Sequence, residues 1–414
     1  MATWLFKRYF RSGAYGWQGS TLAAKRLREA ISEIKAAAKT EPVQAGEGVV
    51  ALCERLWPAF QHIDTSSGSL GSAINRTLSA LLPFLISAPA DIKTRRKWLE
   101  RLETAIEDDG VDYLCQVRQV WGKVCAYTAL ANEWADELVP LVRQIKADQN
   151  PGSYSNQTVM CLSCLLETGR YGELEELLTS APHLFWHEQE YWAEALGRQG
   201  EIDKAIKYAE SCRHPHEYYE TEINEFCEKL LLNAGRWEEA YRRYGLSIRH
   251  GHTYIAQYKA ITAKYPQLDS KQILHDLIAA SSNAGDWFAA ARSAGHLDIA
   301  LECALAGTPN PGTLATAARD TVASAPEFAF TVALRALHLF IDGYGYENPW
   351  PDALRATDAI IGASRALGNP ASCFTQMKSV ISRIKDDREP LAEMLRRHLK
   401  NNWPELRSSG DQLR

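Results

Sequence analysis

The sequence predicts an all-α fold, an α-solenoid of stacked helical hairpins with no significant β-sheet. Three observations predict it. Apolar residues recur at three- to four-residue spacing along most of the 414 residues. No run of alternating β-branched residues lies between turn signals. A glycine pattern repeats between residues 169 and 300. Because single cores stop growing at roughly 250–300 residues, we expect either several domains or an elongated array.

Residues 1–150 are predicted to form an N-terminal helical region. Leu27, Ile31 and Ile34 share one stripe of a helix expected at 20–40. Further helices are expected at 48–63, 70–86, 92–106, 111–130 and 132–145. Pro58 is expected to kink or divide the helix at 48–63, and Pro83 is expected to bend the last turn of the helix at 70–86. The Asn150-Pro151-Gly152 junction is the predicted end of this region.

Five segments between residues 151 and 305 share one form. A glycine is followed by a large apolar residue two positions later and by a small or apolar residue five positions later, beginning at Gly169, Gly200, Gly235, Gly285 and Gly295. Glycine adopts the left-handed conformation that ends a helix. The large residue covers the turn, and the small residue lets the next helix approach. Because one such hairpin cannot bury its own apolar stripe, the hairpins are predicted to stack.

The form Gly-x-aromatic-x-x-Ala, as in Gly235-Arg-Trp-Glu-Glu-Ala240, resembles tetratricopeptide repeats, and residues 191–208 match best. The glycines are 31, 35, 50 and 10 residues apart, and the proline expected at repeat ends is missing, so the sequence departs from a regular array. The resemblance implies a scaffold that presents an extended surface to partners. Residues 286–292, 313–319 and 343–347 also resemble uncharacterised bacterial all-helical proteins.

Residues 306–414 are predicted to form a C-terminal helical region. Its helices are expected at 311–323, 327–340, 351–367, 370–384 and 390–401. Prolines at 311, 351, 370 and 390 stand where four of these helices begin, and the first turn of a helix tolerates proline best.

Charge is spread unevenly along the chain. Residues 1–100 contain 14 Lys and Arg against 8 Asp and Glu, whereas residues 151–303 contain 14 against 22. The acidic middle suits a basic peptide or protein partner. Nucleic acid would be contacted by the first hundred residues, because binding to phosphate needs a basic face.

The sequence also predicts a cytoplasmic protein. No apolar run approaches the ~20 residues of a membrane span. Charges interrupt the apolar residues of the first 17 positions, so we expect no export signal. The nine cysteines are an odd number and lie mostly in apolar helical patterns, which is typical of reduced, buried thiols.

Few residues suggest chemistry. Cys161 and Cys164 have zinc-like spacing and could join Cys212, His214 and His216, but buried core cysteines and loop histidines are the favoured alternative. His250 is expected to end a helix, where the dipole favours its cationic form. No phosphate loop, nucleophile elbow or dinucleotide fingerprint is present. We therefore expect neither enzymatic activity nor a cofactor.

The N-terminal segment is the candidate partner-binding site. Trp4, Phe6, Arg8, Tyr9 and Phe10 combine large apolar rings with a cation and could dock into a partner's groove or onto an anionic surface. In the alternative, the segment folds back onto the first helix. The predicted function is a non-enzymatic scaffold that binds a protein or peptide as a subunit of a bacterial complex. The alternative function is a nucleic-acid-associated component of a bacterial defence or regulatory complex, using the basic N-terminal region.

Overall fold

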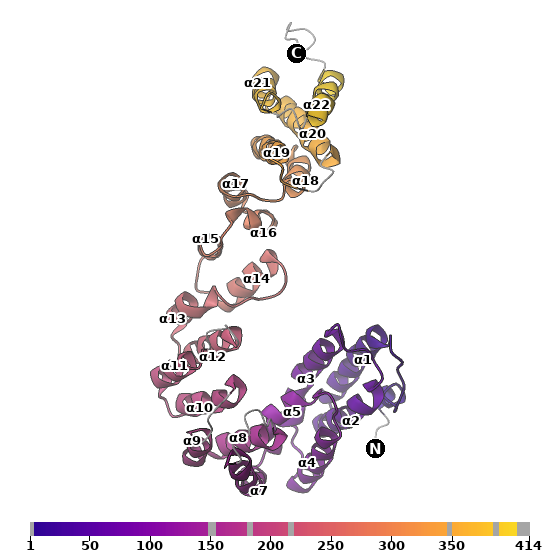
Figure 1. Ribbon diagram of the computed structural model, residues 1–414, viewed down its shortest axis with the longest axis vertical. Helices are drawn as coiled ribbons and strands as arrows, with labels where there is room; N and C mark the ends of the chain where they lie inside the picture. Colours follow the sequence, from indigo (N-terminus) through magenta and orange to yellow (C-terminus); the bar gives the residue numbers. More distant parts are fainter. Residues whose placement is uncertain are drawn as a thin grey trace. The chain divides into compact units, whose positions relative to one another are not determined.

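A computed structural model describes residues 4–147, 155–179, 185–213, 219–345, 350–383 and 389–403 of the chain. The chain divides into two compact units, Met1–Ile223 and Asn224–Arg414. Every regular element in the described residues is helical and none is a strand, so the predicted all-α class is confirmed (Figure 1). Among these helices, none combines the length and the apolar character that crossing a membrane requires.

The first unit opens with a short 3-10 turn, η1 (Leu5–Arg8), and continues with α-helices. They are α1 (Ser20–Ala38), α2 (Pro42–Phe60), α3 (Ser69–Ser87), α4 (Ile92–Glu107), α5 (Cys115–Gln119), α6 (Trp121–Cys125), α7 (Thr128–Ala147), α8 (Asn156–Thr168), α9 (Tyr171–Thr179), α10 (Trp186–Arg198) and α11 (Ile202–Ser211). Helix α1 packs on α2 and α3, α2 packs on α4, α7 packs on α8, and α10 packs on α11.

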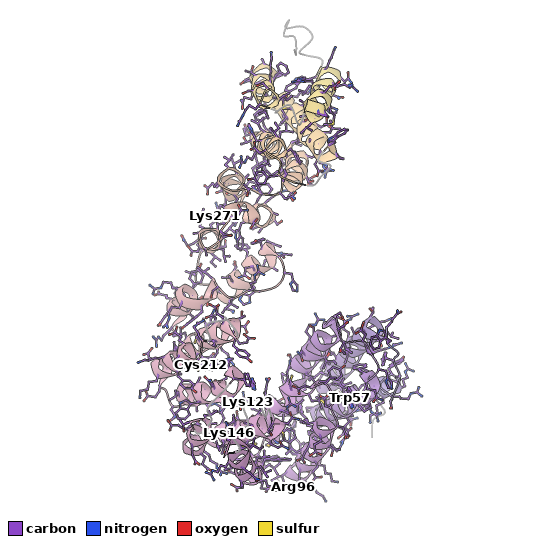
Figure 2. The ribbon with its side chains drawn as sticks, in the orientation of Figure 1. Trp57, Arg96, Lys123, Lys146, Cys212 and Lys271 are labelled. Atoms are coloured by element: carbon purple, nitrogen blue, oxygen red, sulfur yellow. The ribbon has the colours of Figure 1, made fainter. Side chains whose placement is uncertain are left out.

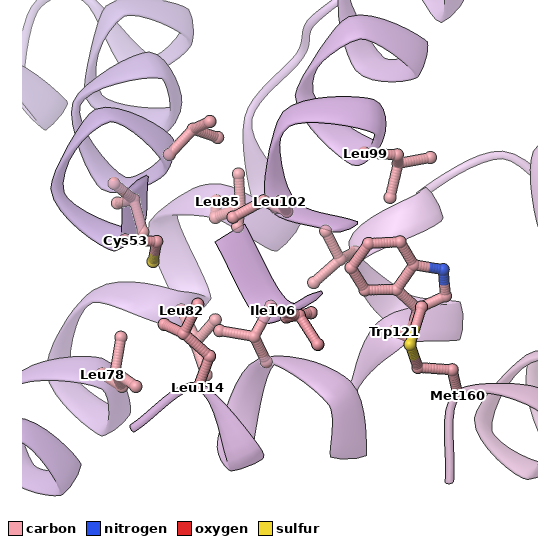
Figure 3. Packing of buried hydrophobic residues seen from close by; sticks show 14 of the residues in the cluster. Cys53, Leu78, Leu82, Leu85, Leu99, Leu102, Ile106, Leu114, Trp121 and Met160 are labelled. Atoms are coloured by element: carbon pink, nitrogen blue, oxygen red, sulfur yellow. The ribbon is translucent and has the colours of Figure 1, made fainter. Parts of the chain in front are cut away.

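The core of the first unit is apolar and continuous. Side chains from α2, α3 and α4 converge in it, including Cys53, Leu82 and Leu102 (Figure 3). Helices α2 and α3 run through Pro58 and Pro83 without a break, so neither proline divides its helix. The apolar stripe of each helix thus stays on one face along its full length.

The helix predicted over 111–130 is wrong. Two five-residue helices, α5 and α6, replace it, and Ala126 ends the second in a left-handed conformation with φ +60°. The reason is packing against α8. A Cβ on Gly122 would lie 2.3 Å from the carbonyl oxygen of Ser163, and the Gly122 N–H donates to the Ser163 hydroxyl at 3.0 Å. This close contact with α8 interrupts the helix that the apolar periodicity of the sequence predicts.

The second unit continues from α12 (Glu220–Asn233), which crosses the division between the units. Its other elements are α13 (Trp237–Ala240), the π-helical turn η2 (Tyr241–Gly245), α14 (Tyr254–Lys264), α15 (Ser270–Ala279), the 3-10 turn η3 (Ala284–Trp287), α16 (Phe288–Ser293), α17 (Leu297–Ala306), α18 (Pro311–Thr321), α19 (Pro326–Ile341), α20 (Trp350–Ala366), α21 (Pro370–Ile381) and α22 (Glu389–Asn402). Helix α16 packs on α17, α18 on α19, and α19 on α20.

The two units do not coincide with the predicted three regions. The predicted junction at Asn150-Pro151-Gly152 lies outside the described residues, and the helices on either side of it, α7 and α8, pack on each other. Near the other predicted boundary, at residue 305, α17 packs on α19. Helical packing therefore continues past both positions.

Four of the five repeat glycines have the predicted left-handed conformation. Gly169, Gly200, Gly235 and Gly295 have φ between +71° and +87°. After each, the next residue donates its N–H to a carbonyl five positions back, as Arg236 does to Leu231 at 2.9 Å, which is the bond that closes a helix ending in a left-handed glycine. The residues at the fifth position are all buried: Leu174, Ala205, Ala240, Ala290 and Ala300.

Gly285 is a glycine for a different reason, so the expectation of a left-handed turn there is wrong. It lies in η3, and a Cβ on it would come within 2.4 Å of the Pro309 nitrogen. Close backbone approach, and not the left-handed conformation, requires glycine here. Gly343 and Gly368, which the repeat pattern does not include, do end helices in the left-handed conformation.

We expect the same substitution to have opposite effects at two glycines of the first unit. Gly200→Ala should lower the free energy of unfolding by about 1–2 kcal/mol, because alanine strains a left-handed position, while Gly172→Ala should raise it by about 0.5 kcal/mol, because Gly172 lies within α9. An added Cβ meets no atom within 4 Å at either site, so only the backbone conformation differs. Urea unfolding followed by circular dichroism measures both, and effects of equal sign would contradict the turn assignment.

Candidate functional site

A pocket of about 440 Å³ lies in the second unit, between the loop that precedes α14 and the segment joining α15 to η3. We call it the 254/287 pocket after Tyr254 and Trp287, and the residues that line it include Ser247, Arg249, His252, Tyr254, Gln257, Leu277, Asp286 and Trp287. Helix α14, which forms part of its wall, occupies the 50-residue gap between Gly235 and Gly285. The irregularity of the repeat therefore coincides with the pocket.

Hydrogen bonds fix the loop that forms one wall. The Gln257 side chain accepts a bond from the His250 backbone N–H at 2.5 Å and donates one to the Ile248 carbonyl at 2.6 Å. Thr253 caps α14 by accepting a bond from the Ala256 N–H at 3.2 Å. The loop thus has a defined conformation set by the first turn of α14.

The buried carboxylate of Glu228 is linked to the same loop through Lys264. Glu228 is 2% exposed, accepts a bond from the Tyr265 hydroxyl at 2.5 Å, and pairs with the Lys264 ammonium at 2.7 Å. Lys264 lies 3.4 Å from Nε2 of His250. Burial and the neighbouring carboxylate raise the pKa of Tyr265, so its hydroxyl keeps the proton that it donates.

His250 does not occupy the helix end predicted for it. It lies in the loop between η2 and α14, and burial, followed by the positive charge of Lys264, lowers the pKa of its imidazole. The expectation of a cationic histidine stabilised by a helix dipole is therefore wrong. A neutral imidazole next to the Lys264–Glu228 pair is the arrangement that the structure favours.

The opposite wall combines an aromatic pair with a carboxylate. The Tyr254 hydroxyl donates to Oδ2 of Asp286 at 3.0 Å, and Asn283 donates to Oδ1 at 2.9 Å. The Tyr254 and Trp287 rings meet edge to face, with centroids 4.8 Å apart. Trp287 is 4% exposed, and its indole N–H has no acceptor among the described residues. A buried donor without an acceptor destabilises the folded state, because it has lost its hydrogen bond to water.

Acidification should destabilise the second unit through His250. Its folded-state pKa is lowered, so the unfolded chain binds the proton more tightly, and stability is lost as pH falls through the unfolded value of about 6.5. The charged groups around it are Lys264, Glu228 and Glu225. His250→Gln should reduce the loss of unfolding free energy between pH 7.5 and 5.5. An unchanged pH dependence would show that His250 does not contribute. Burial is also the main cause that lowers the pKa of His187 and of His338, and their contribution to the pH dependence should remain in the variant.

The predicted partner-binding segment at the N-terminus is largely packed into the first unit. Trp4, Phe6 and Phe10 are at most 5% exposed, Tyr9 is half-buried, and only Arg8 is exposed. The Glu33 carboxylate on α1 accepts the N–H groups of Leu5 and Phe6, which anchors η1. Trp4, Phe6 and Phe10 thus belong to the apolar core of the first unit in this structure.

The candidate metal ligands do not come together among the described residues. Cys161 and Cys164 are fully buried in α8, and burial raises the pKa of the Cys161 thiol to about 12, whereas a zinc ligand must lose its proton. Cys212, labelled in Figure 2, ends α11 and donates to the Tyr208 carbonyl at 3.2 Å. His214 and His216 lie outside the described residues. The described residues hold no group of three or more potential metal ligands.

No protein-family model matches the chain, and no curated protein matches it. Its function is therefore inferred from its own residues. The residues of the 254/287 pocket were not predicted as a site from the sequence. The 50-residue gap between repeat glycines, with an extra helix inside it, was the signal that could have indicated them.

Proposed function

We propose that this protein is a non-enzymatic helical-repeat scaffold that binds a protein or peptide partner as a subunit of a bacterial complex. In this proposal, the helical pairs joined at left-handed glycines stack as a tetratricopeptide-like α-solenoid, and the inserted helix α14 opens a recognition pocket. The observation that carries the proposal is the 254/287 pocket, with the aromatic pair of Tyr254 and Trp287 in its wall.

The pocket chemistry suits an extended peptide segment. Tyr254 lines the pocket and is 40% exposed, so its ring offers a surface on which an anchoring side chain can pack. The exposed carboxylate of Asp286 suits a basic residue next to that anchor. The excess of acidic over basic residues in 151–303 favours the same partner charge.

The first experiment places a photo-crosslinking amino acid at Ser282, which is exposed and lines the pocket, in the full-length protein in its host. The control places it at Ser379, an exposed residue of α21. We expect a partner protein to be captured from position 282 and not from 379. Capture of the same proteins from both positions would contradict the proposal.

A binding measurement then tests the pocket itself. A synthetic peptide covering the cross-linked segment should bind the wild-type protein, and Tyr254→Ala should weaken binding at least tenfold, which is about 1.4 kcal/mol. Tyr344→Ala is the matched control, because Tyr344 is 49% exposed and does not line the pocket. Equal losses in both variants, or none in either, would reject the pocket as the binding site.

A further inference from the structure

A second pocket, of about 410 Å³, lies in the first unit where the N-terminal segment crosses α1. Leu22 and Arg26 of α1 line it together with Arg8, Tyr9, Arg11, Ser12 and Tyr15 of the segment. We call it the arginine pocket. Its volume is within the roughly 300–1,000 Å³ of small-ligand pockets. The arginine pocket shares no lining residue with the 254/287 pocket, so an inference from one does not rest on the other.

Positive charge is concentrated around this pocket. The first 28 residues contain six Lys and Arg and no Asp or Glu. Arg26 pairs with Glu29 at 2.6 Å, whereas Arg8 and Arg11 form no ion pair with any described residue. The guanidinium carbons of Arg26 and Arg8 lie 3.7 and 4.6 Å from the centroid of the same Tyr9 ring. Because no carboxylate of the described residues neutralises Arg8 or Arg11, an anion next to these two side chains would be stabilised.

A tyrosine hydroxyl adds a directional donor. Tyr15 is 5% exposed and lines the arginine pocket, and its ring packs edge to face on Phe60 with centroids 5.2 Å apart. Its hydroxyl forms no hydrogen bond within the described part of the chain. Burial is the main cause that raises the pKa of Tyr15, so the group keeps its proton and can donate it to an anionic oxygen.

We propose that the arginine pocket binds a phosphodiester group of single-stranded nucleic acid. Arg8 and Arg11 supply the charge, and the Tyr15 hydroxyl supplies a hydrogen bond to a phosphate oxygen. The first 28 residues contain six cations, whereas one phosphodiester carries a single negative charge. The excess of cations suits a ligand with several phosphates in a row, such as a nucleic-acid strand. Exposed guanidinium groups such as that of Arg8 also offer flat surfaces on which unpaired bases stack.

The test measures fluorescence anisotropy of a labelled 12-nucleotide single strand with the full-length protein at several salt concentrations. Arg8→Gln/Arg11→Gln should weaken binding at least tenfold and lower the slope of log affinity against log salt by about 0.7, the value for one phosphate that is no longer neutralised. Tyr15→Phe keeps the ring and should weaken binding two- to fivefold. Arg76→Gln/Lys93→Gln removes the same charge from exposed residues of the first unit and should change affinity less than twofold.

Thermal unfolding of each variant separates binding from folding, and we expect unchanged midpoints because Arg8 and Arg11 are exposed. Equal weakening by both double variants would overturn the proposal, since it would show attraction by net charge alone. Absence of binding by the wild-type protein would also overturn it. Pocket-dependent binding to vesicles containing a quarter phosphatidylserine, without binding to the strand, would assign the pocket to a membrane surface and overturn it as well.

Discussion

Replacing Arg95 with methionine should lower the free energy of unfolding of the first unit by about 3–5 kcal/mol. Arg95 is fully buried, and its guanidinium donates to the carbonyls of Leu85, Ala88 and Val124 at 2.6, 2.6 and 3.3 Å. These carbonyls lie at the ends of α3 and α6, where helix dipoles place negative charge. Methionine fills part of the volume but leaves the three acceptors buried without donors, each at a cost of about 1–3 kcal/mol before relaxation.

The neighbouring residue provides the control for Arg95. Arg96 is exposed on the same helix and pairs with Glu133 at 2.6 Å, and an exposed pair of this kind contributes little to stability because water screens it. Arg96→Met should therefore have a small effect. Chemical unfolding monitored by tryptophan fluorescence gives both values, and a cost below 1 kcal/mol for Arg95→Met would show that the guanidinium does not hold these helix ends together.

Glu228→Ala should lower the free energy of unfolding of the second unit by about 2–4 kcal/mol. It would leave the Tyr265 hydroxyl and the Lys264 ammonium without the carboxylate that accepts from both. Breaking a buried pair by removing one partner costs about 3–5 kcal/mol. We expect somewhat less, because the Lys264 side chain is 30% exposed and can regain water. The loop of the 254/287 pocket should loosen with it, since Lys264 lies next to His250.

Glu225→Ala separates this effect from the general loss of a carboxylate in α12. Glu225 is exposed one turn before Glu228 on the same helix, so its removal should change stability by less than about 0.5 kcal/mol. If the two variants are equally stable, Glu228 is not the support of the loop. If Glu228→Ala alone is destabilised and also loses peptide affinity, the carboxylate stabilises both the unit and the pocket.

The helices were predictable because their causes are local. Left-handed glycines such as Gly200 and Gly235 follow helical stretches in the sequence, and the absence of a side chain lets them adopt this conformation without strain. The segment 111–130 was not predictable in the same way. Its break depends on the backbone of Ser163, which lies 41 residues from Gly122 along the chain. Periodicity carries no information about such a neighbour.

The candidate sites were less predictable than the helices. The pattern from Trp4 to Phe10 indicates that these rings need an apolar surface, but it does not say whether that surface is the chain's own α2 or a partner. In the structure the ring of Phe10 packs on the ring of Phe60 in α2, with centroids 5.6 Å apart. The 254/287 pocket joins Tyr254 and Trp287, which are 33 residues apart and carry no signal singly. Only the unusual glycine spacing pointed to that region.

Backbone hydrogen exchange of the full-length protein, with and without the cross-linked partner peptide, tests the central claim most directly. That claim is that the inserted helix α14 opens a pocket in which a partner segment binds. We expect the peptide to slow exchange in residues 246–257 and 280–287, and to leave α1–α4 unchanged. Slowed exchange elsewhere, with these two stretches unaffected, would contradict it.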